Sequence, residues 1–214
     1  MCLEREVCVE WERVMSDLMN AFGPIDIYLF DQLLRGRILP GMRVLDVGCG
    51  GGRNLVYLLR EGFEVYGVDE DPRAVAAVRE LATQLGGVAE QFRVEAMEAM
   101  SFEEGFAEVV IASAVLHFAR DDAQFAAMLR GAWRALRPGG LWFCRLASTI
   151  GMESRMERIA GRRYRLPDGS DRYLVDEAML LRWSAELGGE LVDPLKTTVV
   201  QDQRAMTTWV MRKR

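Results

Sequence analysis

The sequence predicts an α/β fold: a doubly wound, mostly parallel sheet of seven strands with helices on both faces and a C-terminal antiparallel hairpin. From residue 42 onward, short apolar segments alternate with amphipathic ones, which is typical of a parallel sheet with crossover helices. The segment Glu108–Ala112 is almost entirely apolar, as expected for a strand buried on both faces. Near the C-terminus two apolar segments flank a short polar turn, which predicts the hairpin.

The first 40 residues are expected to form an N-terminal helical cover. Apolar residues recur there at a spacing near that of a helix: Leu3, Val7, Trp11, Met15, Leu18 and Met19. Gly23-Pro24 interrupts this pattern, and a second helix carries Ile27 to Leu34 and ends near Gly36. Pro40-Gly41 then forms a turn before the first strand.

Residues 41–147 contain the regular alternation and are expected to form the cofactor-binding core. The five predicted strands are Arg43–Val47, Glu64–Asp69, Phe92–Ala96, Glu108–Ala112 and Leu141–Leu146. The three predicted helices are Asn54–Arg60, Pro72–Leu85 and Asp121–Leu136. Pro72 suits the first turn of its helix, and Pro138-Gly139-Gly140 stops the last one.

The alternation breaks after Ala147. Residues 148–175 are polar and rich in arginine, so we expect a loop or small excursion on the substrate side of the sheet. In residues 176–214, Asp176 is a plausible N-cap for a helix that ends at Gly188. The strands Glu190–Val200 and Ala205–Met211 follow, and the whole chain is expected to form one domain.

Composition excludes several classes of partner. The chain has 27 Lys and Arg against 32 Asp and Glu, a net charge of −5, which counts against non-specific binding to nucleic acid. The longest apolar stretch, Val109–Leu116, is far shorter than the ~18 residues that a membrane span requires. The acidic N-terminus does not resemble an export signal, so a cytoplasmic protein is expected.

The cysteines also favour the cytoplasm. The four of them show no paired spacing and are interpreted as reduced structural thiols, not as metal ligands or disulfides: Cys2, Cys8, Cys49 and Cys144. No metal site is therefore expected.

A glycine cluster between the first strand and its helix points to a ligand. Gly48, Gly50 and Gly52 allow positive φ angles and a close approach of the backbone to a bound molecule. Seventeen residues after Gly52, Asp69 ends the second strand, where a carboxylate can accept hydrogen bonds from both ribose hydroxyls. Because ligands of such sheets bind beyond the carboxyl ends of the strands, these positions predict a cofactor that contains a nucleoside.

The details of the cluster argue against a dinucleotide. Arg53 stands where the dinucleotide fingerprint has its third glycine. Asp46, two residues before Gly48, would repel a pyrophosphate and instead suits an ammonium group. A nicotinamide-dependent oxidoreductase on the same sheet remains an alternative.

The pattern from Asp46 to Gly52, with an acid ending the next strand, resembles the class I S-adenosylmethionine-dependent methyltransferases. Leu136–Gly140 is similar to that family's L-x-P-G-G turn, and Val115–Phe118 is similar to its V-L-H-x segment. The resemblance covers residues 40–147. It implies a Rossmann-like methyltransferase fold, S-adenosylmethionine as cofactor and S-adenosylhomocysteine as product.

The resemblance also implies roles for individual residues. Asp46 and Gly48 would lie at the methionine amine. The same loop would contribute four further cofactor-binding residues: Cys49, Gly50, Gly52 and Asn54. Asp69 would hold the ribose, with Glu70 near the ribose or the adenine. Ala112 and Ser113 would flank the methionyl carboxylate and the sulfonium.

The adenine end departs from the family pattern. The resemblance implies that Met97 offers its backbone N–H to the adenine ring, but Ala96 stands where the family often has an aspartate. Glu98 or Glu95 could replace that aspartate. This departure keeps open a protein that binds S-adenosylmethionine without catalysis.

The acceptor side is less defined. His117, the one histidine of the chain, is a candidate general base, and a structural or cofactor-proximal histidine is the favoured alternative. Arginine is the general surface cation of this chain, but Arg145 and a following cluster could hold an anionic acceptor: Arg155, Arg158, Arg162, Arg163, Arg165 and Arg172. Tyr28 is a candidate to cover the site.

The chain resembles the small-molecule branch of the family. Gly52-Arg53-Asn54 is similar to the tellurite-resistance and thiol methyltransferases. The residues after the fourth predicted strand, Ala112-Ser113-Ala114-Val115, lack the N/D-P-P-Y/F motif of enzymes that act on protein or nucleic acid. We therefore expect methyl transfer to a small molecule by a monomer or homodimer.

Overall fold

The computed structural model describes residues 17–214, with residues 17–22 in helical conformation. Four residues of the predicted N-terminal helical pattern lie outside the described residues: Leu3, Val7, Trp11 and Met15. Two of the cysteines, Cys2 and Cys8, also lie outside them.

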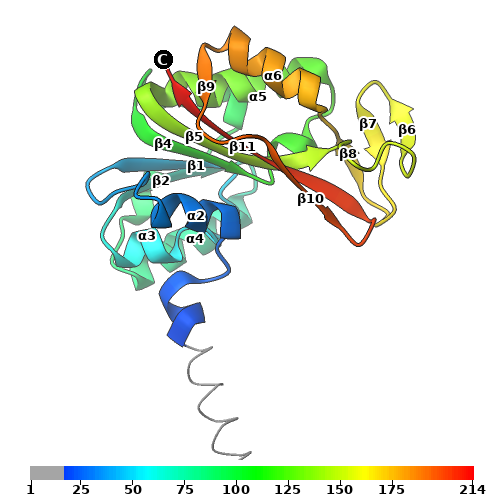
Figure 1. Ribbon diagram of the computed structural model, residues 1–214. Coiled ribbons are helices and arrows are strands. Elements are labelled where there is room, and N and C mark those ends of the chain that lie inside the picture. Colours follow the sequence, from blue (N-terminus) through cyan, green and yellow to red (C-terminus); the bar gives the residue numbers. More distant parts are fainter. Residues whose placement is uncertain (1–16) are drawn as a thin grey trace, which may run out of the picture.

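A mixed sheet of eight strands runs through the molecule in the order β10-β11-β5-β4-β1-β2-β3, with β9 also paired to β11 (Figure 1). Five strands are mutually parallel: β1 (Arg43–Val47), β2 (Glu64–Asp69), β3 (Phe92–Val94), β4 (Ala107–Ser113) and β5 (Leu136–Ser148). The remaining strands are β9 (Gly189–Leu191), β10 (Lys196–Val200) and β11 (Arg204–Lys213). β11 is antiparallel to its neighbours β5 and β10, which confirms the predicted terminal hairpin.

Helices cover both faces of this sheet (Figure 1). One face carries α2 (Ile27–Leu34), α3 (Val56–Arg60) and α4 (Pro72–Gln84), and the other carries α5 (Asp122–Ala135) and α6 (Glu177–Glu186). Four of these five helices begin at an aspartate whose carboxylate accepts a first-turn N–H: Asp26, Asp71, Asp121 and Asp176. The predicted N-cap at Asp176 is therefore confirmed.

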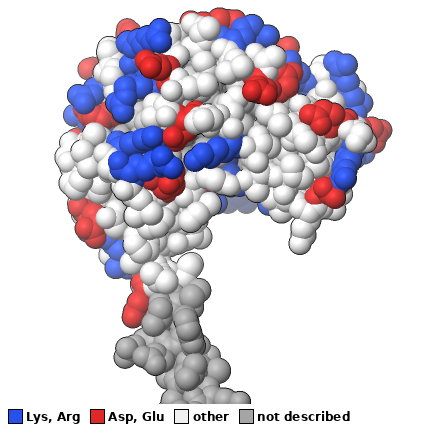
Figure 2. Space-filling view, viewed as in Figure 1, with Lys and Arg blue, Asp and Glu red and all other residues white. Residues whose placement is uncertain are grey.

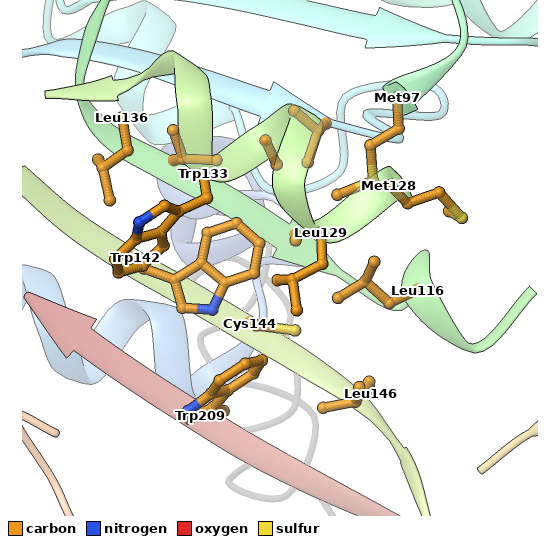
Figure 3. Packing of buried hydrophobic residues seen from close by; sticks show 14 of the residues in the cluster. Met97, Leu116, Met128, Leu129, Trp133, Leu136, Trp142, Cys144, Leu146 and Trp209 are labelled. Carbon is orange, nitrogen blue, oxygen red and sulfur yellow. The ribbon is translucent and has the colours of Figure 1, made fainter. Parts of the chain in front are cut away.

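The largest part of the core lies between the sheet and the two helices α5 and α6. Figure 3 shows Trp133 of α5, Trp142 of β5 and Trp209 of β11 packed in sequence. The ring of Trp142 meets the other two near edge-on, at centroid distances of 6.2 and 6.1 Å. Trp142 and Trp209 are fully buried, so this contact fixes the antiparallel strand against the parallel part of the sheet.

Two predicted strands differ substantially from the structure, whereas the other strand boundaries differ by two residues at most. β5 begins directly after α5 at Leu136, five residues early, because Leu136 pairs with Ala107 before an irregularity in the ladder. The predicted strand Glu190–Val200 is split into β9 and β10 around Pro194, which has no N–H to donate to a ladder. At this break the carboxylate of Asp193 instead accepts hydrogen bonds from Arg37 at 2.6 and 3.1 Å.

Residues 148–175 are also more ordered than a loop. They contain a separate three-stranded antiparallel sheet of β6 (Glu157–Ala160), β7 (Arg163–Arg165) and β8 (Asp171–Tyr173), which projects from the body beside β10 (Figure 1). β6 is exposed throughout, β7 and β8 are partly buried, and Tyr173 in β8 is buried. Strands of three or four residues are too short to show a regular alternation in sequence. Three short 3-10 turns complete the chain: Ala89–Gln91 (η1), Met97–Ala99 (η2) and Leu116–Phe118 (η3).

Candidate active site

The glycine loop between β1 and α3 takes the conformation that its sequence predicts. Gly48, Gly50 and Gly52 have φ values of +71°, +52° and +83°. A Cβ on Gly48 would overlap the side chain of Val115, whereas a Cβ on Gly50 would meet nothing within 4 Å. The loop therefore presents bare backbone toward open space at the carboxyl end of β1.

Asp69, at the end of β2, faces this loop. Gly50 donates its backbone N–H to Oδ2 of Asp69 at 2.9 Å, and Asp71 donates its N–H to Oδ1 at 3.0 Å. Each carboxylate oxygen keeps a further lone pair, so the carboxylate can accept two more hydrogen bonds from neighbouring hydroxyls.

Two adjoining cavities meet at Asp69, and together they form what we call the cleft. The first has a volume of about 280 Å³ and the second about 560 Å³, and both are lined by Gly48, Asp69, Ala114 and Phe118. The second cavity is further lined by the loop that follows β1, including Cys49, Gly50, Gly52, Arg53 and Asn54. The predicted loop residues are thus brought to one wall, although Cys49 is itself buried.

The smaller cavity has an apolar floor and a polar rim. Met97 and Met128 line it together with the carboxylates of Glu70 and Glu95 and the side chain of Gln124. The predicted alternative to Ala96, Glu98, does not line it: Oε1 of Glu98 accepts a hydrogen bond from Gln124 at 3.1 Å. Gln124 and Met128 were not predicted, because nothing in the sequence distinguishes them from other residues of an amphipathic helix.

Asp46 lies beneath the loop and does not line the cleft. Its side chain is buried, and burial raises its pKa to about 8; the charge of Arg53 opposes this rise and that of Asp69 adds to it. A buried carboxyl that is protonated near neutral pH carries no charge, and a cation bound on the other side of the loop would favour loss of its proton.

Ser113 and Asn54 secure the wall of the cleft near Arg53. Oγ of Ser113 accepts a hydrogen bond from Arg53 at 3.1 Å, and Oδ1 of Asn54 accepts the backbone N–H of Asp26 at 3.0 Å. Ser113 lines the larger cavity, whereas Ala112 is fully buried in β4 and lines none of the cavities described here.

A third cavity of about 240 Å³ adjoins the cleft, and we call it the arginine cavity. It shares Arg53 and Ala114 with the larger cavity of the cleft. Ala114 has a φ of +63°, in the left-handed region that few non-glycine residues adopt. Four arginines line it: Arg53, Arg145, Arg172 and Arg204. Figure 2 shows this side of the molecule hollowed between the body and the projecting β6–β8 sheet.

His117 lines the arginine cavity in a form that cannot act as a base. Its Nδ1 accepts the backbone N–H of Ala147 at 3.2 Å, so the proton of the neutral ring is on Nε2. Burial, followed by the charges of Arg172 and Arg204, lowers the pKa of His117 to about 3. With one nitrogen accepting and the other protonated, the ring has no lone pair left for an acceptor proton.

Arg145 is held by a buried carboxylate. Its Nη1 donates to Oδ2 of Asp26 at 2.9 Å, and the side chain of Asp26 has no solvent exposure. Among residues 17–214, the buried Nε of Arg145 has no hydrogen-bond partner. The guanidinium also lies 5.3 Å from the ring centre of Tyr28, whose hydroxyl contacts Oγ1 of Thr198 at 2.5 Å. Tyr28 therefore supports the arginine and does not line the three cavities.

The structure does not bring Arg155 to this site. Arg155 is half-exposed and pairs with Asp202 at the tip of the β10–β11 hairpin, outside the arginine cavity. The residues that sequence reasoning missed are Arg53 and Arg204, which lie 151 positions apart in a 214-residue chain. Only the position of Arg53 directly after the glycine cluster could have indicated it.

Two further findings concern metal ligands and membrane spans. Among the described residues no group of three or more histidine, cysteine, aspartate or glutamate side chains could hold a metal ion. Within residues 17–214 no helix has both the length and the apolar character to cross a membrane.

Comparison with known proteins agrees with this geometry. A family model described as a methyltransferase domain matches residues 44–140. An uncharacterized methyltransferase of Synechocystis is 36% identical over 108 residues, which span 49% of this chain and 47% of the relative. A ubiquinone biosynthesis O-methyltransferase of Pseudomonas aeruginosa is 33% identical over 170 residues, 75% of this chain and 69% of the relative. The chain thus spans about half to two thirds of the length of these relatives.

Among solved structures, the 1,6-didemethyltoxoflavin-N1-methyltransferase of Burkholderia thailandensis has a similar fold, with a TM-score of 0.66 and 20% identity. The alignment covers 99% of this chain and 88% of that one, whose structure contains 1,6-didemethyltoxoflavin and S-adenosylhomocysteine. These matches favour the predicted methyltransferase over the nicotinamide-dependent alternative. The chain belongs to the class I S-adenosylmethionine-dependent methyltransferase family.

Proposed function

We propose that this protein transfers a methyl group from S-adenosylmethionine to a small anionic acceptor. The observation that carries the proposal is the junction at Ala114, where the cleft beside Asp69 meets the arginine cavity. A methyl donor in the cleft and an acceptor in the arginine cavity would therefore face each other at Ala114.

The residues of the cleft fit the cofactor. Asp69 has free lone pairs for the ribose hydroxyls of the cofactor. The bare backbone at Gly50 leaves room for the methionyl part of the cofactor. Met97 and Met128 offer an apolar surface to the adenine, with Glu95 and Gln124 as polar partners in place of the missing aspartate. When bound, S-adenosylmethionine supplies an electrophilic methyl group on a sulfonium.

The protein's own part in such a reaction is alignment and exclusion of water. The glycine loop and Asp69 fix the methyl donor. Phe118 lines both parts of the cleft, and the guanidinium of Arg172 lies 4.8 Å from the centre of its ring. The acceptor is oriented by the arginines, which offer forked hydrogen bonds to an anion.

The relatives support a small acceptor. One is named as an O-methyltransferase of ubiquinone biosynthesis, and a structural neighbour binds the small heterocycle 1,6-didemethyltoxoflavin. The arginine cavity of about 240 Å³ suits a molecule of about one ring, below the usual range for drug-sized ligands. The acidic net charge supports an acceptor other than nucleic acid, and the unpaired cysteine pattern supports a cytoplasmic protein. The proposal includes a monomer or homodimer.

The proposal is tested by turnover on fractionated metabolites. The protein is incubated with methyl-deuterated S-adenosylmethionine and with anionic, neutral or cationic small-molecule fractions of a bacterial extract. Mass spectrometry then follows S-adenosylhomocysteine and the deuteromethylated product. We expect product from the anionic fraction alone and none from the Asp69→Ala variant; labelling of cations, nucleic acid or protein instead would contradict the proposal.

A further inference from the structure

Resting on the proposed function, we infer that the acceptor reacts as an oxyanion, the anion of a small phenol, enol or carboxylic acid, and that the arginine cavity itself keeps this oxygen deprotonated. No side chain of the cavity removes the proton. The inference names both the chemical class of the acceptor and the way in which its reacting atom becomes nucleophilic.

The first support is the absence of a usable base among the described residues that line the cavity. His117 has its Nδ1 lone pair occupied by the N–H of Ala147 and its proton on Nε2. Asp168 accepts both the hydroxyl and the N–H of Ser170, at 2.5 and 3.0 Å. Burial raises the pKa of Asp168, but these hydrogen bonds and the charges of Arg204 and Arg172 outweigh it and hold the pKa below its usual range. A carboxylate whose pKa is held below its usual range is a weaker base than an ordinary carboxylate.

The second support is an excess of positive charge that the cavity's own acids do not neutralise. Asp26 lies behind the cavity and pairs with Arg145 at 2.9 Å and, more weakly, with Arg53 at 3.8 Å. Asp168 is 3.9 Å from Arg204. Within residues 17–214, these two carboxylates are the ones at ion-pair distance from any of the four guanidinium groups.

Arg172 is the least neutralised of the four. Within residues 17–214 no carboxylate lies within ion-pair distance of its guanidinium, although Asp168 and Asp171 feel its charge from farther away. Its Nη1 donates only to the backbone carbonyl of Asp171 at 2.8 Å, and its plane rests on Phe118 beside the cleft. An oxyanion at the mouth of the cavity would meet this charge and the Nε2–H of His117.

A guanidinium within a few ångströms lowers the pKa of a neighbouring acid by about 1–3 units. A phenol or enol whose pKa in solution lies no more than about one to three units above the working pH would thus lose its proton to solvent on binding, and a carboxylic acid would already be ionised. The oxygen's electron pair then forms the bond to the methyl carbon as the carbon–sulfur bond breaks, with its electron pair staying on sulfur. The products are a methyl ether or ester and S-adenosylhomocysteine, and charge and atoms balance.

The inference is tested with 4-nitrophenol, whose anion is yellow and which ionises near neutral pH. The pH titration of its absorbance is recorded with and without excess protein saturated with S-adenosylhomocysteine. We expect the apparent pKa to fall by about one unit or more, a tenfold change in the ionisation constant. His117→Asn should keep the shift, whereas the double variant Arg172→Gln/Arg204→Gln should lose it.

Matched controls separate the site from general surface charge. Arg155→Gln removes an arginine outside the cavity and should leave the shift unchanged. The neutral probe 4-nitrobenzyl alcohol, of similar size, should not compete. The inference is overturned if the pKa of 4-nitrophenol is unchanged, which includes failure of the probe to bind. It is also overturned if the pKa shift survives in the double variant but is lost in His117→Asn. Binding of S-adenosylhomocysteine, measured in the same samples, reports separately on the proposed function.

Discussion

The backbone N–H of Ala147 on β5 donates a hydrogen bond of 3.2 Å to Nδ1 of His117, which lies in the turn after β4. This contact fixes which nitrogen of the ring carries the proton. The one histidine of the chain, which lines the arginine cavity, is therefore a hydrogen-bond donor through Nε2 and not the candidate base.

The state of His117 can be observed directly, since no other histidine contributes a signal in untagged protein. We expect nitrogen-15 NMR to show the tautomer protonated at Nε2 and no ring titration above about pH 4, because the pKa is lowered to about 3. A ring that is protonated at Nδ1, or that titrates near pH 6.5, would contradict the hydrogen bond and restore the general base.

The same lowered pKa gives a pH dependence of stability. Between about pH 3 and 6.5 the unfolded chain binds a proton at His117 that the folded protein refuses, so the free energy of unfolding falls as the pH falls. The slope from this residue approaches about 1.4 kcal/mol per pH unit within that window. Urea denaturation of His117→Asn should lose this part of the slope, and an unchanged slope would count against it.

Asp46 should report the arrival of the cofactor. With its pKa raised to about 8, Asp46 is protonated in the free protein near pH 7, and an ammonium bound in the cleft, across the glycine loop from it, would favour the ionised form. Binding of S-adenosylhomocysteine at pH 7 is therefore expected to release close to one proton. Calorimetry in buffers of different ionisation enthalpy measures this number, and Asp46→Asn should reduce it to near zero; release that persists in the variant would assign the proton elsewhere.

Gly52 is expected to be irreplaceable for a steric reason as well as a conformational one. Gly52 and Gly86 share a φ of +83°, but a Cβ on Gly52 would lie 2.7 Å from Val78 and one on Gly86 would meet nothing within 4 Å. Gly86→Ala should cost about 1–2 kcal/mol of unfolding free energy from backbone strain. Gly52→Ala should cost about 1–3 kcal/mol more. Equal losses in urea denaturation would show that the loop yields to the extra carbon.

Asp26 links the segment before α2 to the arginines. Asp26→Asn keeps the N-cap acceptor but places an uncharged amide against Arg145, and it should destabilise the protein by about 3 kcal/mol because the cation loses its buried partner. Asp71→Asn is the matched control, since Asp71 also caps a helix and pairs with an arginine, but at the surface. Its effect on the denaturation midpoint should be small. A similar shift for both variants would show that burial adds nothing.

The cofactor side of the site was predictable because its residues are close in sequence and share one supersecondary unit. The glycines after β1 and Asp69 at the end of β2 occupy one β-α-β unit, so their spacing alone implies that they meet. Hydrophobic periodicity likewise located the five parallel strands, with errors only at their ends.

The arginine cavity could not be predicted in the same way. Arg53, His117, Arg145, Arg172 and Arg204 come from five separate segments, and only the folded sheet brings them together. The tautomer of His117 depends on one backbone N–H thirty residues away, which no sequence pattern records. The β6–β8 sheet was interpreted as a loop because its strands of three or four residues are too short to show a hydrophobic period.

The central claim is that the cleft at Asp69 binds the methyltransferase cofactor, and calorimetric titration with S-adenosylhomocysteine tests it most directly. The account predicts saturable binding by the wild-type protein and no binding of NADH. Asp69→Ala should weaken binding at least about tenfold, as expected for lost hydrogen bonds to a charged group. Absence of S-adenosylhomocysteine binding, or binding that Asp69→Ala leaves unchanged, would contradict the account.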